Sequence, residues 1–520
     1  MERRIRWLKK PAATASVLLP LFYGSSAFAH GLGQRYDLPV PLWLYLTGAA
    51  AAVALSFVVT GLFVRGNPGS ASYPRLNLLQ SRAGRFFNHP MLLQTCKLLS
   101  VILFVLVILA GLLGRQNPAR NLAPPFIWVI WWVGLAYVSA LVGNLWALIN
   151  PWKILFTWAE DLYRRFYPDG GISLNLAYPR WLGVWPGFLL FFAFAWIELI
   201  YHGRVWPQKL AVLVIAYSAI TWLGMILFGK HRWLRGGEAF SIAFGLLARF
   251  APTETRVRDR ALCDACSGAC RDPGECINCY ECLERAKEAD REWNLRPFAV
   301  GLLRNDANSP SMTAFVLLML ATVTFDGFAA TPVWVNLEIR LYVLLSFLGP
   351  ARLTVIDTAG LISFVALFIG VYLVFCRLIA LASGTALSPG QLAHAFVFTL
   401  IPIALAYHLI HYLSYFLIQG QLMIPILSDP FAWGWNLMGT AGYQIDTSIV
   451  SPRLMWFTAV AAIVLGHIIA VYLAHVLALR LLEERKRALR SQYPMLVLML
   501  TYTVVSLWIM AQPIVEGEGV

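Results

Sequence analysis

Blocks of about 20 apolar residues recur along this chain, and they constrain its fold more than any other feature. A helix of about 20 apolar residues is long enough to cross the roughly 30 Å hydrocarbon core of a bilayer. Hydrophobic residues make up 59% of the 520 residues and charged residues only 13%, whereas a soluble globular protein carries about 25% charged residues. The sequence therefore predicts an all-α integral membrane protein.

The apolar blocks divide the chain into two groups of membrane spans. We expect transmembrane helices 1–5 within residues 30–228 and helices 6–10 within residues 312–520, separated by a Cys-rich metal-binding loop at 229–311. The expected spans are 41–64, 91–114, 126–148, 181–201, 209–228, 312–330, 355–378, 391–418, 454–478 and 494–512. The apolar segment 332–350 contains Asn336, Glu338 and Arg340, so we interpret it as an interfacial or re-entrant segment.

Residues 1–29 have the pattern of a cleavable signal peptide. Basic residues precede a short apolar run from Ala12 to Tyr23, and a small-x-small site follows at Ala27–Phe28–Ala29. An uncleaved first helix is the alternative. Cleavage would leave His30 as an N-terminus outside the cytoplasm, where its amine and ring nitrogen could bind copper or do nothing.

The net charge of +14 has an uneven distribution along the chain. If the mature N-terminus is outside, 27 of the 41 Lys and Arg residues fall in cytoplasmic loops and 8 in outer segments, as the positive-inside rule requires. The charge thus indicates orientation and not a nucleic-acid partner. We expect a bacterial inner membrane protein with a periplasmic mature N-terminus, a cytoplasmic Cys-rich loop and the lipid bilayer as its first partner.

Six cysteines are clustered within the predicted cytoplasmic loop. Thiolates two residues apart converge readily on a soft metal, so this pattern favours a structural zinc ion or an iron–sulfur cluster. The second half looks like the first three ligands of a bacterial ferredoxin motif but lacks the following Cys-Pro, and unmetallated thiols remain an alternative. The expected metal ligands are Cys263, Cys266, Cys270, Cys276, Cys279 and Cys282.

Ionisable residues inside predicted spans are costly and often functional. Here they concentrate toward the outer ends of the spans. We expect Asp326 and Glu198 to be catalytic, and His408, His411, His467 and His202 to offer ligands for a second metal that activates water. The alternative is that each group only bonds a neighbouring helix. The spacing of His394 and His408 would also suit haem, but that of His467 and His475 does not match it.

Five stretches give the chain a resemblance to a bacterial family of multi-span membrane proteins. They are HGLGQRYDLPVPLWLY (30–45), NPWK (150–153), GEAFSIAFGLLARFAP (237–252), IPIALAYHLIHYLSYFLIQGQ (401–421) and RSQYPML (490–496). The chain resembles the family named fenitrothion hydrolase. The resemblance implies hydrolysis of an apolar phosphorothioate triester with release of a nitrophenol, but it assigns no catalytic residue.

Three functions follow as hypotheses. The first is a membrane hydrolase of apolar organophosphorus triesters, acting on a small apolar substrate. The second is a redox or metal-handling membrane protein with iron–sulfur, haem or copper sites. The third is an ion-coupled transporter in which the buried acids and histidines relay protons. A second protein subunit is compatible with all three.

Overall fold

The computed structural model describes residues 38–64, 73–259, 261–262, 266, 276–304, 309–482 and 484–512. The expected signal peptide, His30, Cys263 and Cys270 lie outside the described residues.

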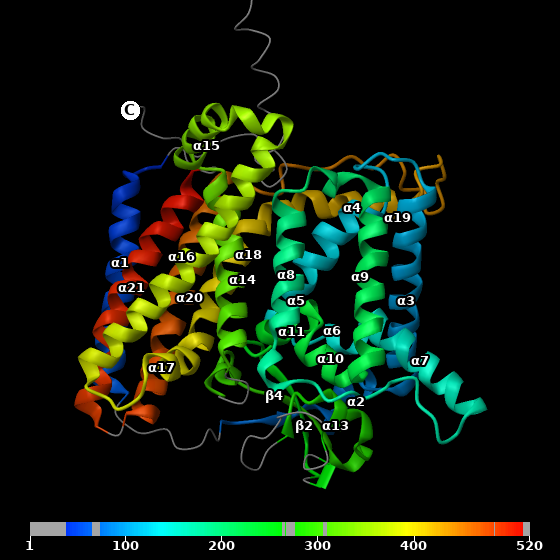
Figure 1. Cartoon of the computed structure of the whole chain (residues 1–520), viewed down its shortest axis with the longest axis horizontal. Coiled ribbons are helices and arrows are strands. Elements are labelled where there is room, and N and C mark those ends of the chain that lie inside the picture. Colours follow the sequence, from blue (N-terminus) through cyan, green and yellow to red (C-terminus); the bar gives the residue numbers. More distant parts are fainter. Residues whose placement is uncertain are drawn as a thin grey trace, which may run out of the picture.

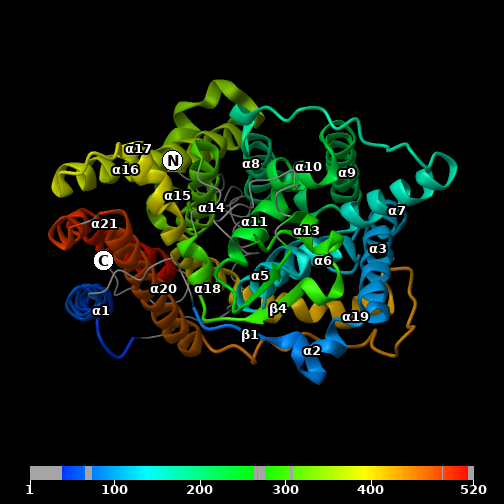
Figure 2. The ribbon, with the colours of Figure 1, turned by 90° about the horizontal axis from the view of Figure 1, so that it is seen from below.

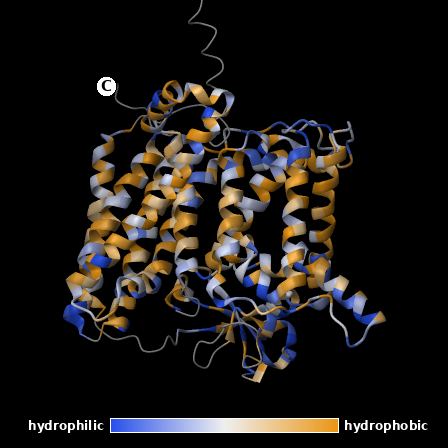
Figure 3. Cartoon of the chain, viewed as in Figure 1, coloured by the Kyte–Doolittle hydropathy of each residue, from blue (hydrophilic) through white to orange (hydrophobic). Residues whose placement is uncertain are grey.

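The described chain is mostly helical, and ten of its helical segments are long and apolar enough to cross a membrane. Figure 3 shows hydrophobic residues along these helices and hydrophilic residues at both ends of the bundle. Both observations support an integral membrane protein. The segments are Leu42–Phe63 (α1), Pro90–Leu113 (α3), Ala123–Leu141 (α4 to α5), Arg180–Leu199 (ending in α8), Pro207–Phe228 (α9), Pro310–Ala329 (α14), Ser346–Ser383 (ending in α16), Pro389–Ser428 (α17 to α19), Pro452–Leu481 (α20) and Arg485–Ala511 (α21).

The helices form two groups that do not follow chain order strictly. In one group α3 packs on α9, and α8 packs on the short helix α11 (Ala239–Leu247). In the other, α16 (Arg352–Ser383) packs on α21 and α14, and α1 packs on α20 and α21. Contacts of α14 with α8 (Trp185–Leu199), and of α18 (Ile401–Gln419) with the third span, join the groups. Figure 1 shows both groups side by side.

The third and eighth spans are discontinuous. The third span contains a nine-residue π-helix, Phe126–Gly134, between α4 (Ala123–Pro125) and α5 (Leu135–Leu141). The eighth span passes from α17 (Pro389–Phe396) through a 3-10 turn, Val397–Leu400, into α18 and then α19 (Met423–Ser428). Such irregular turns often accompany functional sites.

The third span is shorter than the sequence predicts. It ends at Leu141, not at residue 148, because the chain turns at Gly143, whose φ is +156°. The hydroxyl of Thr253 fixes this turn by donating to the Val142 carbonyl at 2.5 Å. A short helix, α6 (Trp146–Ile149), and an amphipathic helix, α7 (Pro151–Phe166), follow.

A small antiparallel sheet lies at one end of the bundle, which we call the sheet end (Figure 1). It adds strands that the all-α prediction does not include. The strand order is β1-β4-β2-β3, and Thr253 pairs with Leu295 at the start of the central ladder. The strands are β1 (Leu76–Asn77), β2 (Thr253–Val257), β3 (Cys276–Ile277) and β4 (Arg291–Leu295).

The segment expected as a single loop at 229–311 has a more complex structure. It begins with α10 (Lys230–Gly236), and α11 then enters the bundle and packs on α5 and α8. Glu238 is fully buried and caps α11 by accepting from the amides of Phe240 and Ser241. Within this segment, the described residues after α11 form the strands of the sheet and contain the cysteine cluster. The last cysteine of the cluster, Cys282, lies on α13 (Tyr280–Arg285).

The segment at 332–350 forms helix α15 (Pro332–Leu344) at the end of the bundle opposite the sheet, which we call the α15 end (Figure 1). Among the residues of α15, only Trp334 is buried. This position agrees with the interfacial alternative for the segment. Viewed along the bundle in Figure 2, α14 and α18 lie on the side of their group that faces the other group, and the spans that contain them are the most buried of the ten.

Candidate functional sites

Four of the predicted polar residues are brought together inside the bundle near the α15 end. Asp326 comes from α14, Glu198 from α8, and His408 and His411 from α18. The Nε2 atom of His411 lies 2.8 Å from Oδ2 of Asp326. The site therefore combines helices from both groups.

Tyr412 joins the two acids. Its hydroxyl lies 2.7 Å from Oδ2 of Asp326 and 3.2 Å from Oε1 of Glu198. A tyrosine hydroxyl carries one proton, so it can donate to only one carboxylate at a time. The arrangement brings two acids, an imidazole and a phenol within reach of a shared proton, and we call these four residues the acid–histidine group: Glu198, Asp326, His411 and Tyr412.

A small cavity adjoins this group. Its volume is about 30 Å³, which is room for about two water molecules. Glu198, Thr322, His408 and Tyr412 supply its polar lining, and Trp132 from the π-helix and Leu247 from α11 are among its apolar walls. His408 is buried, and among the described residues its Nε2 has no hydrogen-bond partner.

The other predicted histidines lie elsewhere. Nδ1 of His467 donates to the Ile463 carbonyl of its own helix at 2.8 Å, and the His467 ring lies 5.9 Å from that of Tyr502. His202 interacts electrostatically with Asp357 near the α15 end. Within the described part of the chain, no set of three His, Asp or Glu side chains converges on one point as metal ligands would.

The cysteine cluster does form such a convergent set. The Sγ atoms of Cys266, Cys279 and Cys282 all lie within 4.8 Å of one another, and those of Cys266 and Cys279 are 3.6 Å apart. Cys276, on β3, interacts with Cys282 and is buried with it. These thiols could hold a metal ion, as the sequence predicts for this set. Burial and the neighbouring Cys279 raise the pKa of the Cys282 thiol, so a bound cation would be needed to keep it ionised.

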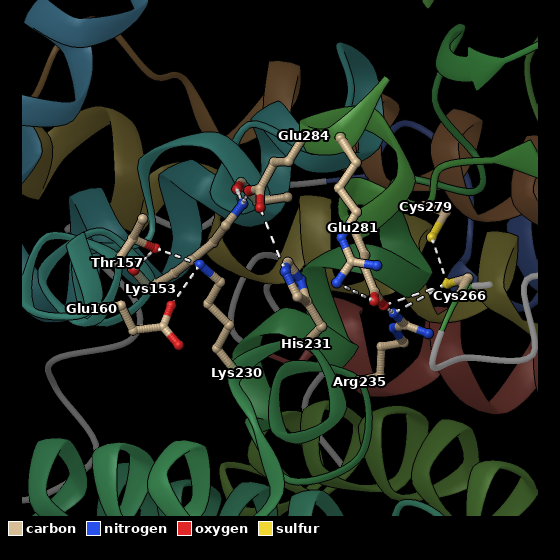
Figure 4. Close-up of polar contacts among 12 residues, drawn as sticks. Lys153, Thr157, Glu160, Lys230, His231, Arg235, Cys266, Cys279, Glu281 and Glu284 are labelled. Carbon is tan, nitrogen blue, oxygen red and sulfur yellow. Dashed lines mark hydrogen bonds and ion pairs between the residues drawn. The ribbon is translucent and has the colours of Figure 1, made fainter. Parts of the chain in front are cut away.

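Charged side chains connect the cysteine cluster to the helices (Figure 4). Glu281 on α13 pairs with Arg235 on α10, and Arg235 also reaches Sγ of Cys266 at 3.6 Å. One turn further along α13, Glu284 pairs with Lys153 on α7. Burial lowers the pKa of Lys153, and Glu284 partly opposes this. We call the contacts of Glu281 and Glu284 with the helices the ion-pair clamp.

His231 also faces the clamp. Its Nε2 lies 3.5 Å from Glu284, yet burial lowers the pKa of His231 to about 4 even though Glu284 acts to raise it. The ring is therefore neutral near pH 7, so its contact with Glu284 is not an ion pair at that pH. The neighbouring Lys230 pairs with Glu160 of α7 at 3.0 Å.

Tyr412, Trp132 and the clamp are not predicted from the sequence. Tyr412 follows His411 directly and lies four residues after His408, so helical spacing places all three on adjoining faces. Lys153 lies in the NPWK stretch, whereas the acids of α13 gave no signal beyond ordinary loop charges. No protein family, curated relative or solved structure matches this chain.

Proposed function

We propose that the protein is a proton-coupled membrane transporter for a small solute, with the acid–histidine group as its proton site. The observation that carries the proposal is one tyrosine hydroxyl within reach of two carboxylates, one of which also contacts a histidine. Ionisable groups paired in this way inside a membrane are typical of proton relays. A proton added to or removed from this group changes which contacts it can make.

The position of the group supports the same function. Transporter sites commonly form where discontinuous helices from two structural groups meet. Here the group lies between α8 of one group and α14 and α18 of the other, and both discontinuous spans border the cavity through Trp132 and His408. Small rearrangements between the groups of helices would open the cavity toward either end.

Accessibility of the cavity from both sides tests this proposal. Thr322 lines the cavity, whereas the next residue of α14, Ala321, is fully buried and does not. We expect Thr322→Cys to react with a membrane-impermeant methanethiosulfonate reagent both in spheroplasts and in inverted vesicles, and Ala321→Cys to react in neither. Labelling read by mass spectrometry at each site keeps the native cysteines from interfering.

The role of protons is tested in the same assay. The ratio of outside to inside labelling of Thr322→Cys should change between pH 5 and pH 8, and adding Asp326→Asn should remove that dependence. Labelling from one side only, or the same pH dependence with Asp326→Asn, would reject proton-coupled transport.

Triester hydrolysis is the second candidate. His411 in contact with Asp326, beside a cavity of water size, could accept a proton from an attacking water molecule, and the family resemblance points to the same reaction. Membranes containing the protein should then release nitrophenol from a phosphorothioate triester, and His411→Ala should abolish the release without lowering protein abundance. Equal release from membranes that lack the protein would reject the hydrolase.

A further inference from the structure

The cysteine cluster has the geometry of a site for a single ion. Four thiolates bound to one tetrahedral zinc ion at about 2.3 Å are separated from one another by roughly 3.8 Å. The 3.6 Å separation of the Cys266 and Cys279 sulfurs is close to that value. In a four-iron cluster each thiolate binds a different iron, which holds the sulfurs further apart. The Sγ atoms of Cys266, Cys279 and Cys282 all lie within 4.8 Å of one another, so these three thiols match one ion better than a cluster. Cys276 lies outside this close set but interacts with Cys282, which makes it the candidate for the fourth ligand.

A preformed turn presents two of the thiols. Asn278, between Cys276 and Cys279, adopts a φ of +52°, a left-handed conformation that asparagine tolerates better than most residues. Its amide donates to the Thr255 carbonyl at 2.8 Å, and its Oδ1 accepts from the Thr255 amide at 2.9 Å. Strand β2 thus holds this turn, and Cys279 and Cys282 follow at the cap and first turn of α13.

The surroundings suit a site of net negative charge. One Zn²⁺ with four thiolates carries a charge of about −2. The Arg235 guanidinium reaches the Cys266 sulfur from α10 at 3.6 Å. The Glu281 carboxylate, 3.4 Å from the same sulfur, is paired with Arg235 and with Arg285. A cation thus faces the thiols from the bundle.

We propose that Cys266, Cys276, Cys279 and Cys282 bind one zinc ion, and that this ion fixes α13 so that the ion-pair clamp docks the sheet onto α7 and α10. The first part of the proposal specifies which ion the cysteine cluster binds and which four thiols are its ligands. The second part assigns the ion a purpose, because Glu281 and Glu284 occupy the same short helix as Cys282. Neither part depends on the proposed transport function.

Metal analysis of the full-length protein in detergent tests the site. We expect about one zinc per chain in the wild type and in Cys96→Ser, a control that changes a thiol of α3. Cys279→Ser and Cys282→Ser should each retain less than about a tenth of that zinc. Exchange with Co²⁺ should give the intense thiolate charge-transfer and d–d bands of a tetrahedral site.

Chelation of the wild-type protein tests docking without relying on variants that fail to fold. Removing zinc should speed hydrogen exchange in α13 and in α10, whereas α16 should not change. Iron with acid-labile sulfide, or equal zinc in Cys282→Ser and Cys96→Ser, would overturn the zinc site. Exchange in α10 that does not respond to zinc removal would overturn the docking role.

Discussion

Replacing Glu254 by glutamine should loosen the sheet from the bundle by a large and local amount. The Glu254 and Arg296 side chains are 0% and 1% exposed, and they lie 2.7 Å apart. Arg75 and Tyr73 also donate to Glu254, at 2.7 and 2.6 Å. Removing one partner of a buried ion pair costs about 3–5 kcal/mol, because the other charge stays buried without compensation. At about 1.4 kcal/mol per factor of ten, amides of the β2–β4 ladder should exchange about a hundredfold to a few thousandfold faster.

The neighbouring Glu292 provides a matched control. It lies on β4 and pairs with Arg258 at 2.5 Å and with Arg256 at 3.5 Å, but the Arg258 and Arg256 side chains are 57% and 27% exposed and keep contact with water when Glu292 is lost. Glu292→Gln should therefore speed exchange of the same amides by less than about tenfold. Hydrogen exchange with mass spectrometry on purified protein measures both. Equal effects of the two substitutions would show that burial of the Glu254–Arg296 pair does not control the stability of the sheet.

Two further predictions concern the clamp and the packing of the spans. Burial lowers the pKa of His231 in the folded protein to about 4, from its ordinary value of about 6.5. The unfolded chain therefore binds a proton at His231 more readily than the folded protein does. The folded state is stabilised above pH 6.5 relative to lower pH, and this contribution is lost as the pH falls from about 6.5 to 4. The amide hydrogen-exchange rates of α10 and α13, corrected for their intrinsic pH dependence, should thus rise as the pH is lowered from 7 to 5. His231→Gln should reduce that rise. An unchanged rise in this variant would show that His231 does not cause the pH dependence. A Cβ at Gly466 would lie 2.7 Å from the Ala406 Cβ and 2.8 Å from the Pro402 carbonyl oxygen, so Gly466→Val should separate α20 from α18 and lower the melting temperature in detergent. Gly370→Ala, where nothing lies within 4 Å, should melt as the wild type does, and equal melting of both variants would refute close packing at Gly466.

The sequence predicted the ten spans well because bilayer thickness imposes one length and one composition on each helix. It predicted badly where tertiary contacts override hydropathy. The third span ends early because Thr253, far along the chain, bonds the turn after Val142. Helix α11 is too short to span and lies beyond the fifth span, so its burial in the bundle depends on contacts with α5 and α8 that periodicity does not reveal.

The candidate site was predicted in part for the same reason. Asp326, Glu198 and His411 stood out because ionisable residues in apolar segments are costly, and the structure brings them together. His467 and His202 stood out equally, but their distance from the group depends on helix rotation and packing, which residue spacing does not specify. Tyr412 was missed because tyrosine is common in apolar segments, so its hydroxyl gives no signal without its partners.

Helix α11 connects the cysteine cluster and the sheet with the cavity. It follows α10, whose Arg235 contacts the cysteine cluster, and Leu247 near its end lines the cavity beside Glu198 and His408. Immediately after α11, the carbonyls of Ala248 and Arg249 accept from Arg296, the residue that pairs with Glu254 of the sheet. The helix is thus held at one end by the cysteine cluster, through α10, and at the other end by the sheet, through Arg296. Leu247 of α11 forms part of the cavity wall. A movement of the cysteine cluster or the sheet must therefore either strain α11 or change the shape of the cavity. Because a tightly packed core transmits displacement, we expect the shape of the cavity to change.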